Sequence, residues 1–314
     1  MMDKQTKIYV AGHRGMVGAA ILRKLREDGY ENIRFKRRDE LDLLDQAAAE
    51  DFFSAERPEV VFLAAARVGG IMANMMRQAD FLYENLQIQN NVMHAAHRYG
   101  TRTFIFLGSS CIYPKDSPQP IREDSFLHGP FEPTNEGYAI AKIAGMKLFQ
   151  YLAADGVWNG AAVIPCNLYG PGDNFDPGSS HVMAALVKRF VDAVSNKEKR
   201  VTCWGTGTPM REFLHVDDLV RGIFLLLVDN PYGSEPVNIG YGSDMTIREL
   251  AETIACKAGF NGEILWDESK PDGMRRKLMD VTKARAIGFR PEIDPEMGVE
   301  LLIDEYRRTG GAHI

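Results

Sequence analysis

Tyr138 and Lys142 stand four residues apart in the run Tyr-Ala-Ile-Ala-Lys, a spacing that places both side chains on one face of a helix. A free tyrosine, with a pKa of about 10, exchanges protons poorly at neutral pH. A lysine cation beside it stabilises the phenolate, which suits the pair for proton transfer to or from a carbonyl or hydroxyl oxygen. Ser109 follows a strand-like run at 103–108 and could hydrogen-bond the same substrate oxygen. We therefore predict a catalytic triad of Ser109, Tyr138 and Lys142.

A second chemical signal lies near the N-terminus. Gly12, Gly15 and Gly18 have the spacing GxxGxxG between a predicted strand and a predicted helix. Glycines at these positions allow a tight turn and let a pyrophosphate approach the backbone at the helix N-terminus. The motif, in this context, predicts a dinucleotide site rather than an ordinary glycine turn.

The strand after this helix bears on the choice between NAD and NADP. An acidic residue at its end would bind the ribose 2′-hydroxyl of NAD. Here the expected strand, 33–36, leads into Arg37 and Arg38, and Arg14 lies inside the glycine turn. Guanidinium groups bind a 2′-phosphate through charge-assisted, forked hydrogen bonds. These cations favour NADP(H), although a run of this kind can also be a solvated surface.

The elements that must position these residues alternate through the first half of the chain. We expect strands at 7–11, 33–36, 59–66, 103–108 and 161–165, and helices at 19–28, 79–99 and 135–153. Nearly continuous apolar strands indicate burial on both faces. The alternation predicts an α/β fold with a doubly wound parallel sheet of the Rossmann type, whose strand carboxyl ends face the ligand crevice.

After about residue 168 the pattern changes. The segment 169–180 is rich in Gly, Pro, Asp and Asn and is predicted to be loop. Helices are expected at 181–194, 215–228 and 246–259, the last opening with a Thr246–Glu249 capping box, and a strand at 201–204. We expect a dinucleotide-binding domain over 1–168, to which part of 212–240 returns, and a smaller α/β substrate lobe over 169–314.

Composition narrows the class of protein. The 314 residues include 37 Lys and Arg against 43 Asp and Glu, a net charge of −6, which disfavours general binding to nucleic acid or anionic membranes. The longest apolar run, 60–66, is too short to span a bilayer, and the N-terminal apolar stretch is too short for a signal peptide. The four cysteines are scattered, without close pairs. We expect a cytoplasmic protein with no metal, nucleic-acid or membrane partner.

Longer strings match a known family along nearly the whole chain. They are AGHRGMVG (11–18), RDELDLLD (38–45), LAAARVGG (63–70), LGSSCIYP (107–114), EPTNEGYAIAKIAG (132–145), NLYGPGDNF (167–175), SSHV (179–182), WGTGTPMREFLHVDD (204–218) and SKPDGMRRKL (269–278). The chain resembles the extended short-chain dehydrogenase/reductases and, within them, the GDP-L-fucose synthases. The resemblance implies a bifunctional enzyme that epimerises C3 and C5 of GDP-4-keto-6-deoxy-D-mannose and reduces C4 with NADPH. It also implies a homodimer, with 79–99 and 135–153 as candidate interface helices.

The resemblance also implies contacts for each ligand. The cofactor would contact Gly12, His13, Arg14, Gly15, Met16, Val17 and Gly18 in the turn, and Arg37, Arg38, Asp42 and Leu43 around the adenosine. Further cofactor contacts would be Leu107, Gly108, Ser109, Ser110, Lys142, Pro165, Asn167, Leu168 and His181. The GDP-sugar would contact Arg189, Trp204, Arg211, Lys270 and Asp272.

Cys111 and His181 are the residues that separate this family from plain reductases. Epimerisation removes a proton from a carbon beside a ketone and delivers another to the opposite face. A thiol and an imidazole, with pKa values near 8.5 and 6.5, suit that exchange near neutral pH. In the family they form the epimerase acid/base pair. The sequence leaves open which of the two abstracts and which donates at each carbon.

Two residues depart from the family pattern. Cys166 stands where many relatives have a small hydroxyl residue, and Gly137 precedes the tyrosine where many have proline. Since proline is pre-set for a first helical turn, its absence could loosen the start of the catalytic helix. Neither change removes a proton donor, so activity is expected to survive.

Two alternatives remain. One is another nucleotide-sugar enzyme of the superfamily: a 4-epimerase, a 4,6-dehydratase or a simple 4-ketoreductase. A dehydratase would need a carboxylate beside the serine, and the string SSCIYP has none. The other is a non-catalytic NADP(H)-binding sensor, which would be expected to lack Tyr138 or Lys142, and both are present.

Overall fold

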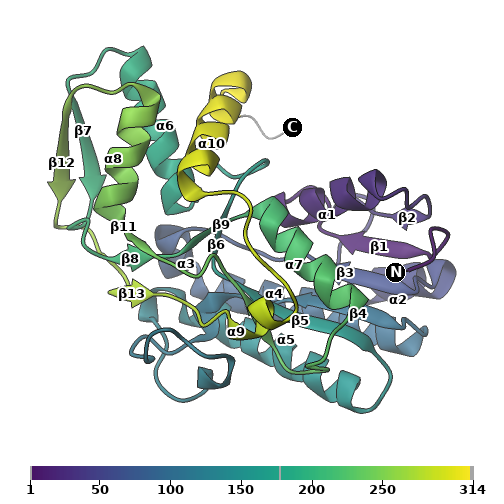
Figure 1. The fold of residues 1–314 in the computed structure, drawn as a ribbon. Helices are drawn as coiled ribbons and strands as arrows, with labels where there is room; N and C mark the ends of the chain where they lie inside the picture. The colour runs from purple at the N-terminus through teal and green to yellow at the C-terminus, as the bar shows by residue number, and fades with distance from the viewer. Residues whose placement is uncertain (1, 177, 312–314) are drawn as a thin grey trace.

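A computed structural model of the chain describes residues 2–176 and 178–311, and its centre is a parallel six-stranded sheet (Figure 1). The strand order is β10-β5-β4-β3-β1-β2. The strands are β1 (Ile8–Ala11), β2 (Ile33–Arg34), β3 (Val60–Leu63), β4 (Thr103–Leu107), β5 (Asn159–Pro165) and β10 (Val237–Ile239). β1, β3 and β10 are buried along their whole length, as expected for strands covered on both faces. The predicted doubly wound sheet is confirmed.

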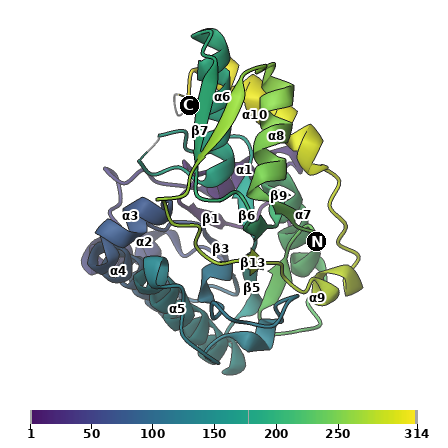
Figure 2. The ribbon, with the colours of Figure 1, turned by 90° about the vertical axis from the view of Figure 1, so that its left-hand side faces the viewer.

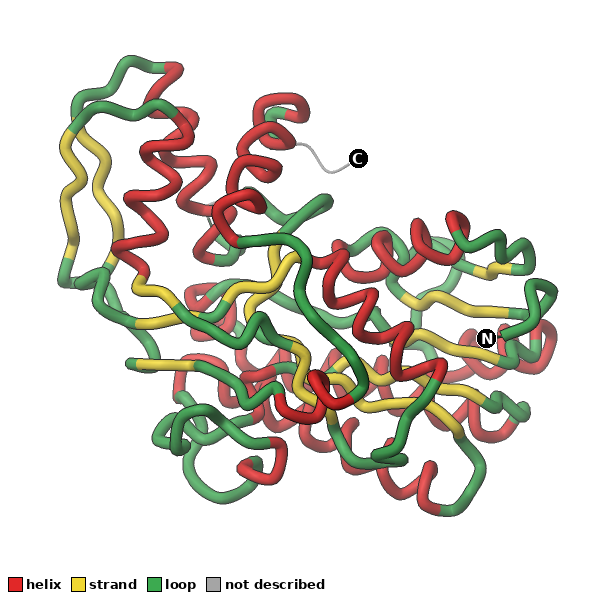
Figure 3. Tube along the Cα trace, viewed as in Figure 1, coloured by secondary structure: helices red, strands yellow, loops and turns green. Residues whose placement is uncertain are grey.

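Helices cover both faces of this sheet (Figure 3). α1 (Met16–Glu27) packs with α7 (Val216–Val228) on one face, while α2 (Gln46–Glu56), α4 (Gln78–Arg98) and α5 (Glu136–Ala154) pack together on the other. The sequence did not lead us to expect α2 or the short helix α3 (Ile71–Met76). α2 begins after Asp45, whose carboxylate accepts hydrogen bonds from the backbone N–H groups of Ala47 and Ala48.

A second group of elements has its own hydrophobic core (Figure 2). α6 (Val182–Ser195), α8 (Ile247–Ala258) and α10 (Pro295–Thr309) pack with one another, and β7 (Arg200–Trp204) pairs in parallel with β12 (Glu263–Asp267). The capping box predicted at Thr246 and Glu249 is present at the start of α8. This core is distinct from the one around the central sheet.

Short strands run between the two cores. β6 (Asn167–Tyr169) pairs with β9 (Phe213–His215), and β8 (Met210–Arg211) lies between β11 (Met245–Thr246) and β13 (Arg276–Lys277). The chain then returns to the first core through Met279, α9 (Thr282–Ala286) and Phe289. We propose a division into 1–168 with part of 212–240, and 169–314, the segment 279–289 packing back on the first unit.

Membrane-spanning helices were sought in the described segments. None of the helices in 2–176 and 178–311 combines the length and the apolar character that crossing a bilayer requires.

Candidate functional site

A cavity of about 750 Å³ is lined by residues of both cores. It begins at Met16, in the first turn of α1, and passes the carboxyl ends of β4 and β5 at Leu107 and Pro165. It ends against Trp204 and Asp272 of the second group of elements. The site therefore lies at the edge of the sheet where ligands bind in doubly wound folds.

The cavity brings many of the sequence-predicted residues together. Five expected catalytic residues line it: Ser109, Cys111, Tyr138, Lys142 and His181. Expected cofactor contacts that also line it are Met16, Val17, Leu107, Gly108, Ser110, Pro165, Asn167 and Leu168. Those outside its lining are Gly12, His13, Arg14, Gly15, Gly18, Arg37, Arg38, Asp42 and Leu43, in the turn before α1 and the segment after β2. Of the expected GDP-sugar contacts, Arg189, Trp204, Arg211 and Asp272 line it and Lys270 does not.

Tyr138 and Lys142 lie on α5 as the spacing predicted, with Lys142 buried. Its Nζ donates a hydrogen bond to the Leu107 carbonyl at 2.9 Å and lies 5.9 Å from the centre of the Tyr138 ring. Burial lowers the pKa of Lys142 to about 8. Burial and the nearby Cys111 raise the pKa of Tyr138, and a hydrogen bond with Ser109 opposes that shift. Tyr138 is thus held in the protonated form that can donate to an oxygen.

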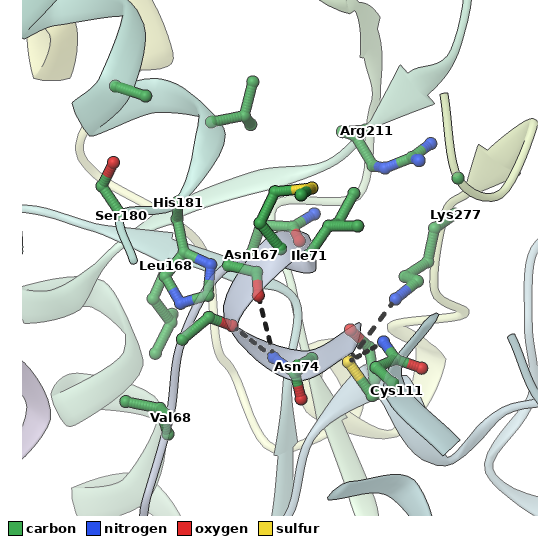
Figure 4. A pocket seen from close by; sticks show the side chains of 18 of the residues that line it. Val68, Ile71, Asn74, Cys111, Asn167, Leu168, Ser180, His181, Arg211 and Lys277 are labelled. Atoms are coloured by element: carbon green, nitrogen blue, oxygen red, sulfur yellow. Dashed lines mark hydrogen bonds between the residues drawn. The ribbon is translucent and has the colours of Figure 1, made fainter. Parts of the chain in front are cut away.

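Cys111 lies just beyond β4, in the single turn Ser110–Ile112. Its Sγ accepts a hydrogen bond from Asn135 Nδ2 at 3.2 Å and lies 3.9 Å from Lys277 Nζ. In Figure 4, His181 lies across the pocket from Cys111 and Lys277. This arrangement offers two proton-exchanging groups to opposite sides of a bound molecule.

His181 occupies the N-cap position of α6 but does not use its side chain as a cap. Its ring is therefore free to act in the cavity. The residues around His181 exclude water from its ring, and together with the Lys277 cation they lower the pKa of His181. The neutral imidazole therefore predominates at neutral pH.

Lys277 and Asn135 are the site residues that the sequence did not single out. β13 pairs with β8 so that Lys277 is in register with Arg211, which brings two cations to one wall of the cavity. In the sequence Lys277 ends the run Arg-Arg-Lys, which looks like a solvated surface; Arg276 does bind Asp244 at the surface. Both missed residues lie within strings shared with the family, the one signal that could have found them.

The glycine turn fits a dinucleotide. Gly12 has φ +84°, and a Cβ there would lie 2.6 Å from the Ala65 nitrogen; a Cβ at Gly18 would lie 2.2 Å from the Gly12 oxygen. Gly15 is the N-cap of α1 and offers no side-chain cap, which leaves first-turn N–H groups free for a phosphate. A side chain at Gly12 or Gly18 would therefore disrupt the turn, so these two positions require glycine.

Three arginines lie in the glycine turn and in the segment after β2, and the charges of Arg14 and Arg37 both act on His13. Arg37 is paired with Glu40 at 3.3 Å, and Arg38 lies 3.7 Å from Asp42. Arg14 is exposed and has no carboxylate partner among the described residues. This set of guanidinium groups fits the 2′-phosphate of NADP(H).

The far end of the cavity suits a nucleotide. Trp204 is 47% exposed, with the Arg189 guanidinium 5.8 Å and Lys270 Nζ 5.7 Å from its ring centre. The Asp272 carboxylate accepts from the backbone N–H and the hydroxyl of Thr206, both at 2.8 Å, which fixes the loop beside Trp204. A flat base can stack on the indole while the cations face phosphates.

Comparisons with known proteins agree with this geometry. Residues 8–240 match the model of the NAD dependent epimerase/dehydratase family. The chain is 53% identical to GDP-L-fucose synthase 1 of Arabidopsis thaliana, over 98% of this chain and 95% of the relative. It is 49% identical to GDP-L-fucose synthase of Escherichia coli (strain K12), over 95% of each. A structure of a GDP-L-fucose synthetase from Naegleria fowleri bound to NADP superposes with a TM-score of 0.89 at 26% identity, covering 99% of this chain and 95% of that one.

Proposed function

The chain belongs to the NAD dependent epimerase/dehydratase family and, within it, to the GDP-L-fucose synthases, and from this premise we propose how its residues perform the reaction. The protein is a bifunctional 3,5-epimerase and NADPH-dependent 4-reductase that converts GDP-4-keto-6-deoxy-D-mannose to GDP-L-fucose. The observation that supports this most directly is one cavity lined by both Cys111 with His181 and Ser109 with Tyr138 and Lys142.

The substrate's own ketone makes one site sufficient for both reactions. The C4 carbonyl acidifies the C–H bonds at C3 and C5, because the electrons left behind can be held as an enolate. Of Cys111 and His181, one removes the proton and the other delivers a proton to the opposite face of the same carbon. The Lys277 ammonium, 3.9 Å from Sγ, stabilises negative charge on the sulfur during this exchange.

Reduction uses the other three residues. NADPH, when bound, supplies the hydride for C4. Ser109 hydrogen-bonds the C4 oxygen and positions it, and Tyr138 donates its phenolic proton to that oxygen. The Lys142 ammonium, held by the Leu107 carbonyl, stabilises the phenolate that remains. The GDP moiety is placed towards Trp204, Arg189 and the Asp272 loop.

One incubation with GDP-4-keto-6-deoxy-D-mannose and NADPH tests the proposal. We expect the NADPH absorbance to fall and NMR to identify GDP-L-fucose. Loss of NADPH with an unepimerised 6-deoxy sugar would leave a 4-ketoreductase, and no loss of NADPH would overturn the substrate assignment.

Two variants separate the half-reactions. Cys111→Ser is expected to lose deuterium uptake from solvent at C3 and C5 while NADPH oxidation continues. Tyr138→Phe is the matched control, because it should lose NADPH oxidation and still exchange deuterium. Full epimerisation by Cys111→Ser would contradict the assigned role of the thiol.

We also propose that the protein is a homodimer. Tyr83 on α4 and Ile140 and Tyr151 on α5 are large apolar side chains exposed on helices that pack side by side. Pairing of these helices with those of a second copy would bury them. Sedimentation velocity should give twice the chain mass, and a Tyr83→Glu, Tyr151→Glu variant should sediment as a monomer.

A further inference from the structure

The first turn of the catalytic helix α5 is held by a residue of another helix. Gln78, the first residue of α4, donates from Nε2 to the Pro133 carbonyl at 2.8 Å. Its Oε1 accepts the Gly137 N–H at 3.1 Å. One amide thus bridges the segment before α5 and the residue immediately before Tyr138.

Gly137 permits this contact. A Cβ built at Gly137 would lie 2.6 Å from the backbone oxygen of Gln78, so a larger residue would push the two helices apart. The absence of proline at this position, which suggested a loose helix start from the sequence, instead leaves an N–H that Gln78 binds. A proline would lack that N–H and would also meet the Gln78 carbonyl.

Asn135 occupies the N-cap position of α5, where asparagine normally accepts an N–H of the first turn. It makes no such cap. Its Nδ2 donates instead to Cys111 Sγ at 3.2 Å, and its Oδ1 is buried without a hydrogen-bond partner among the described residues. The residue best suited to cap the helix is therefore turned towards the thiol.

We propose that Gln78 caps the catalytic helix in place of Asn135, so that the Asn135 amide is free to hold the Cys111 thiol in position for proton exchange. Both are positioning residues, and the inference rests on the proposed function of Cys111. Without the Gln78 amide, the buried Gly137 N–H loses its acceptor. Asn135 Oδ1, which has no partner among the described residues, can then accept the Gly137 N–H from the N-cap position. If the Asn135 amide turns towards Gly137 in this way, its Nδ2 no longer donates to Cys111.

The test measures deuterium uptake at C3 and C5 of the 4-keto sugar without NADPH, beside the NADPH Kd from fluorescence and the thermal midpoint. Gln78→Ala is expected to slow uptake about five-fold, the typical value of one helix cap, with the NADPH Kd unchanged. Gln78→Glu keeps an acceptor for the Gly137 N–H and should recover most of the rate. Should Gln78→Ala fail to fold, Gly137→Ala displaces the same contact and should slow uptake in the same way.

Asn135→Leu distinguishes this arrangement from a general loss of structure. It removes the donor to Cys111 with Gln78 intact, and should slow uptake at least as much as Gln78→Ala. The double variant should be no slower than Asn135→Leu alone, because both changes act on one hydrogen bond. Unchanged uptake in Gln78→Ala, or losses that multiply in the double variant, would overturn the inference. Absence of uptake in the parent protein would instead overturn the proposed function.

Discussion

Lys277 Nζ lies 3.9 Å from Cys111 Sγ, although 166 residues separate the two along the chain. Lys277 is 7% exposed, and no Asp or Glu of residues 2–176 and 178–311 forms an ion pair with it. Burying an ammonium group without a carboxylate partner costs free energy. Such a group is usually found where it stabilises a negative charge that forms on a neighbouring group during the reaction. The Lys277 charge acts on Cys111, His181 and Cys166, and since burial raises the pKa of the Cys166 thiol, Cys111 and His181 are the neighbours suited to exchange a proton.

Replacing Lys277 should therefore affect epimerisation more than reduction. Lys277→Met is expected to lower deuterium uptake at C3 and C5 about ten-fold, the scale of one charge-assisted contact. Because the Lys277 cation helps to lower the pKa of His181, its removal should also move the His181 limb of the pH–rate profile to higher pH. Lys277→Arg keeps the charge and is the control. An unmoved limb in Lys277→Met would contradict the electrostatic role.

The pH dependence of reduction should follow Lys142. Burial lowers the pKa of Lys142 to about 8, and only the protonated amine stabilises the Tyr138 phenolate. The rate of NADPH oxidation is thus expected to fall as pH rises through about 8. Lys142→Arg stays charged throughout this range, so its rate, though lower, should show no such limb. Stopped-flow measurements from pH 6 to 10 check this, and a limb near 8 that persists in Lys142→Arg would assign it to another group.

The expectation that strands and helices alternate was correct because strands such as β1 and β3 are buried along their whole length and helices such as α1 bury one apolar face. α2 was missed although Asp45 precedes it as a cap, since its run Gln-Ala-Ala-Ala-Glu-Asp has little periodicity. α3 has six residues, fewer than two turns, too few to show a helical period. α10 was missed as well, although it has 15 residues, an Asp294 cap and a buried apolar face. The failures therefore include one long helix besides the short or weakly amphipathic ones.

Some of the site residues could be predicted from the sequence, and others could not. Tyr138 and Lys142 could be paired from the sequence, because one helix turn fixes their distance. Lys277, Asn135 and Gln78 could not, because their partners are set by the β13–β8 register and by the packing of α4 on α5. Spacing along the chain contains no information about such contacts.

The preference for NADPH should depend on the cations after β2. Arg38 is exposed and lies 3.7 Å from Asp42, a contact that a 2′-phosphate can replace. Arg38→Ala is expected to raise KM for NADPH at least ten-fold and to change KM for NADH little, because a charge-assisted hydrogen bond contributes roughly 1.5–3 kcal/mol. Steady-state kinetics with both cofactors give the ratio of KM for NADPH to KM for NADH in the variant and in the parent. Equal increases for NADPH and NADH would mean that Arg38 does not contact the 2′-phosphate.

Glu212 should make folding stability depend on pH. It is fully buried, accepts backbone hydrogen bonds from Gly242 at 2.6 Å and Met279 at 3.1 Å, and burial raises its pKa to about 7. Between pH 4.5 and 7 the folded state holds a proton that the unfolded state has lost, so the free energy of unfolding falls as pH rises, by on the order of 3 kcal/mol. Burial also raises the pKa of Asp173 to about 7, so its titration lowers the free energy of unfolding over the same pH range.

Glu212→Gln removes one of these titrations. The variant loses a backbone acceptor and should be less stable than the parent at pH 5, but the difference should shrink towards pH 8, where the parent has to bury a carboxylate. Urea unfolding at several pH values, followed by tryptophan fluorescence, measures this. Asp173→Asn, tested alongside, should show the same convergence. If the stability curves of parent and Glu212→Gln run parallel from pH 5 to 8, Glu212 does not titrate in this range and its two backbone contacts hold a permanently charged carboxylate.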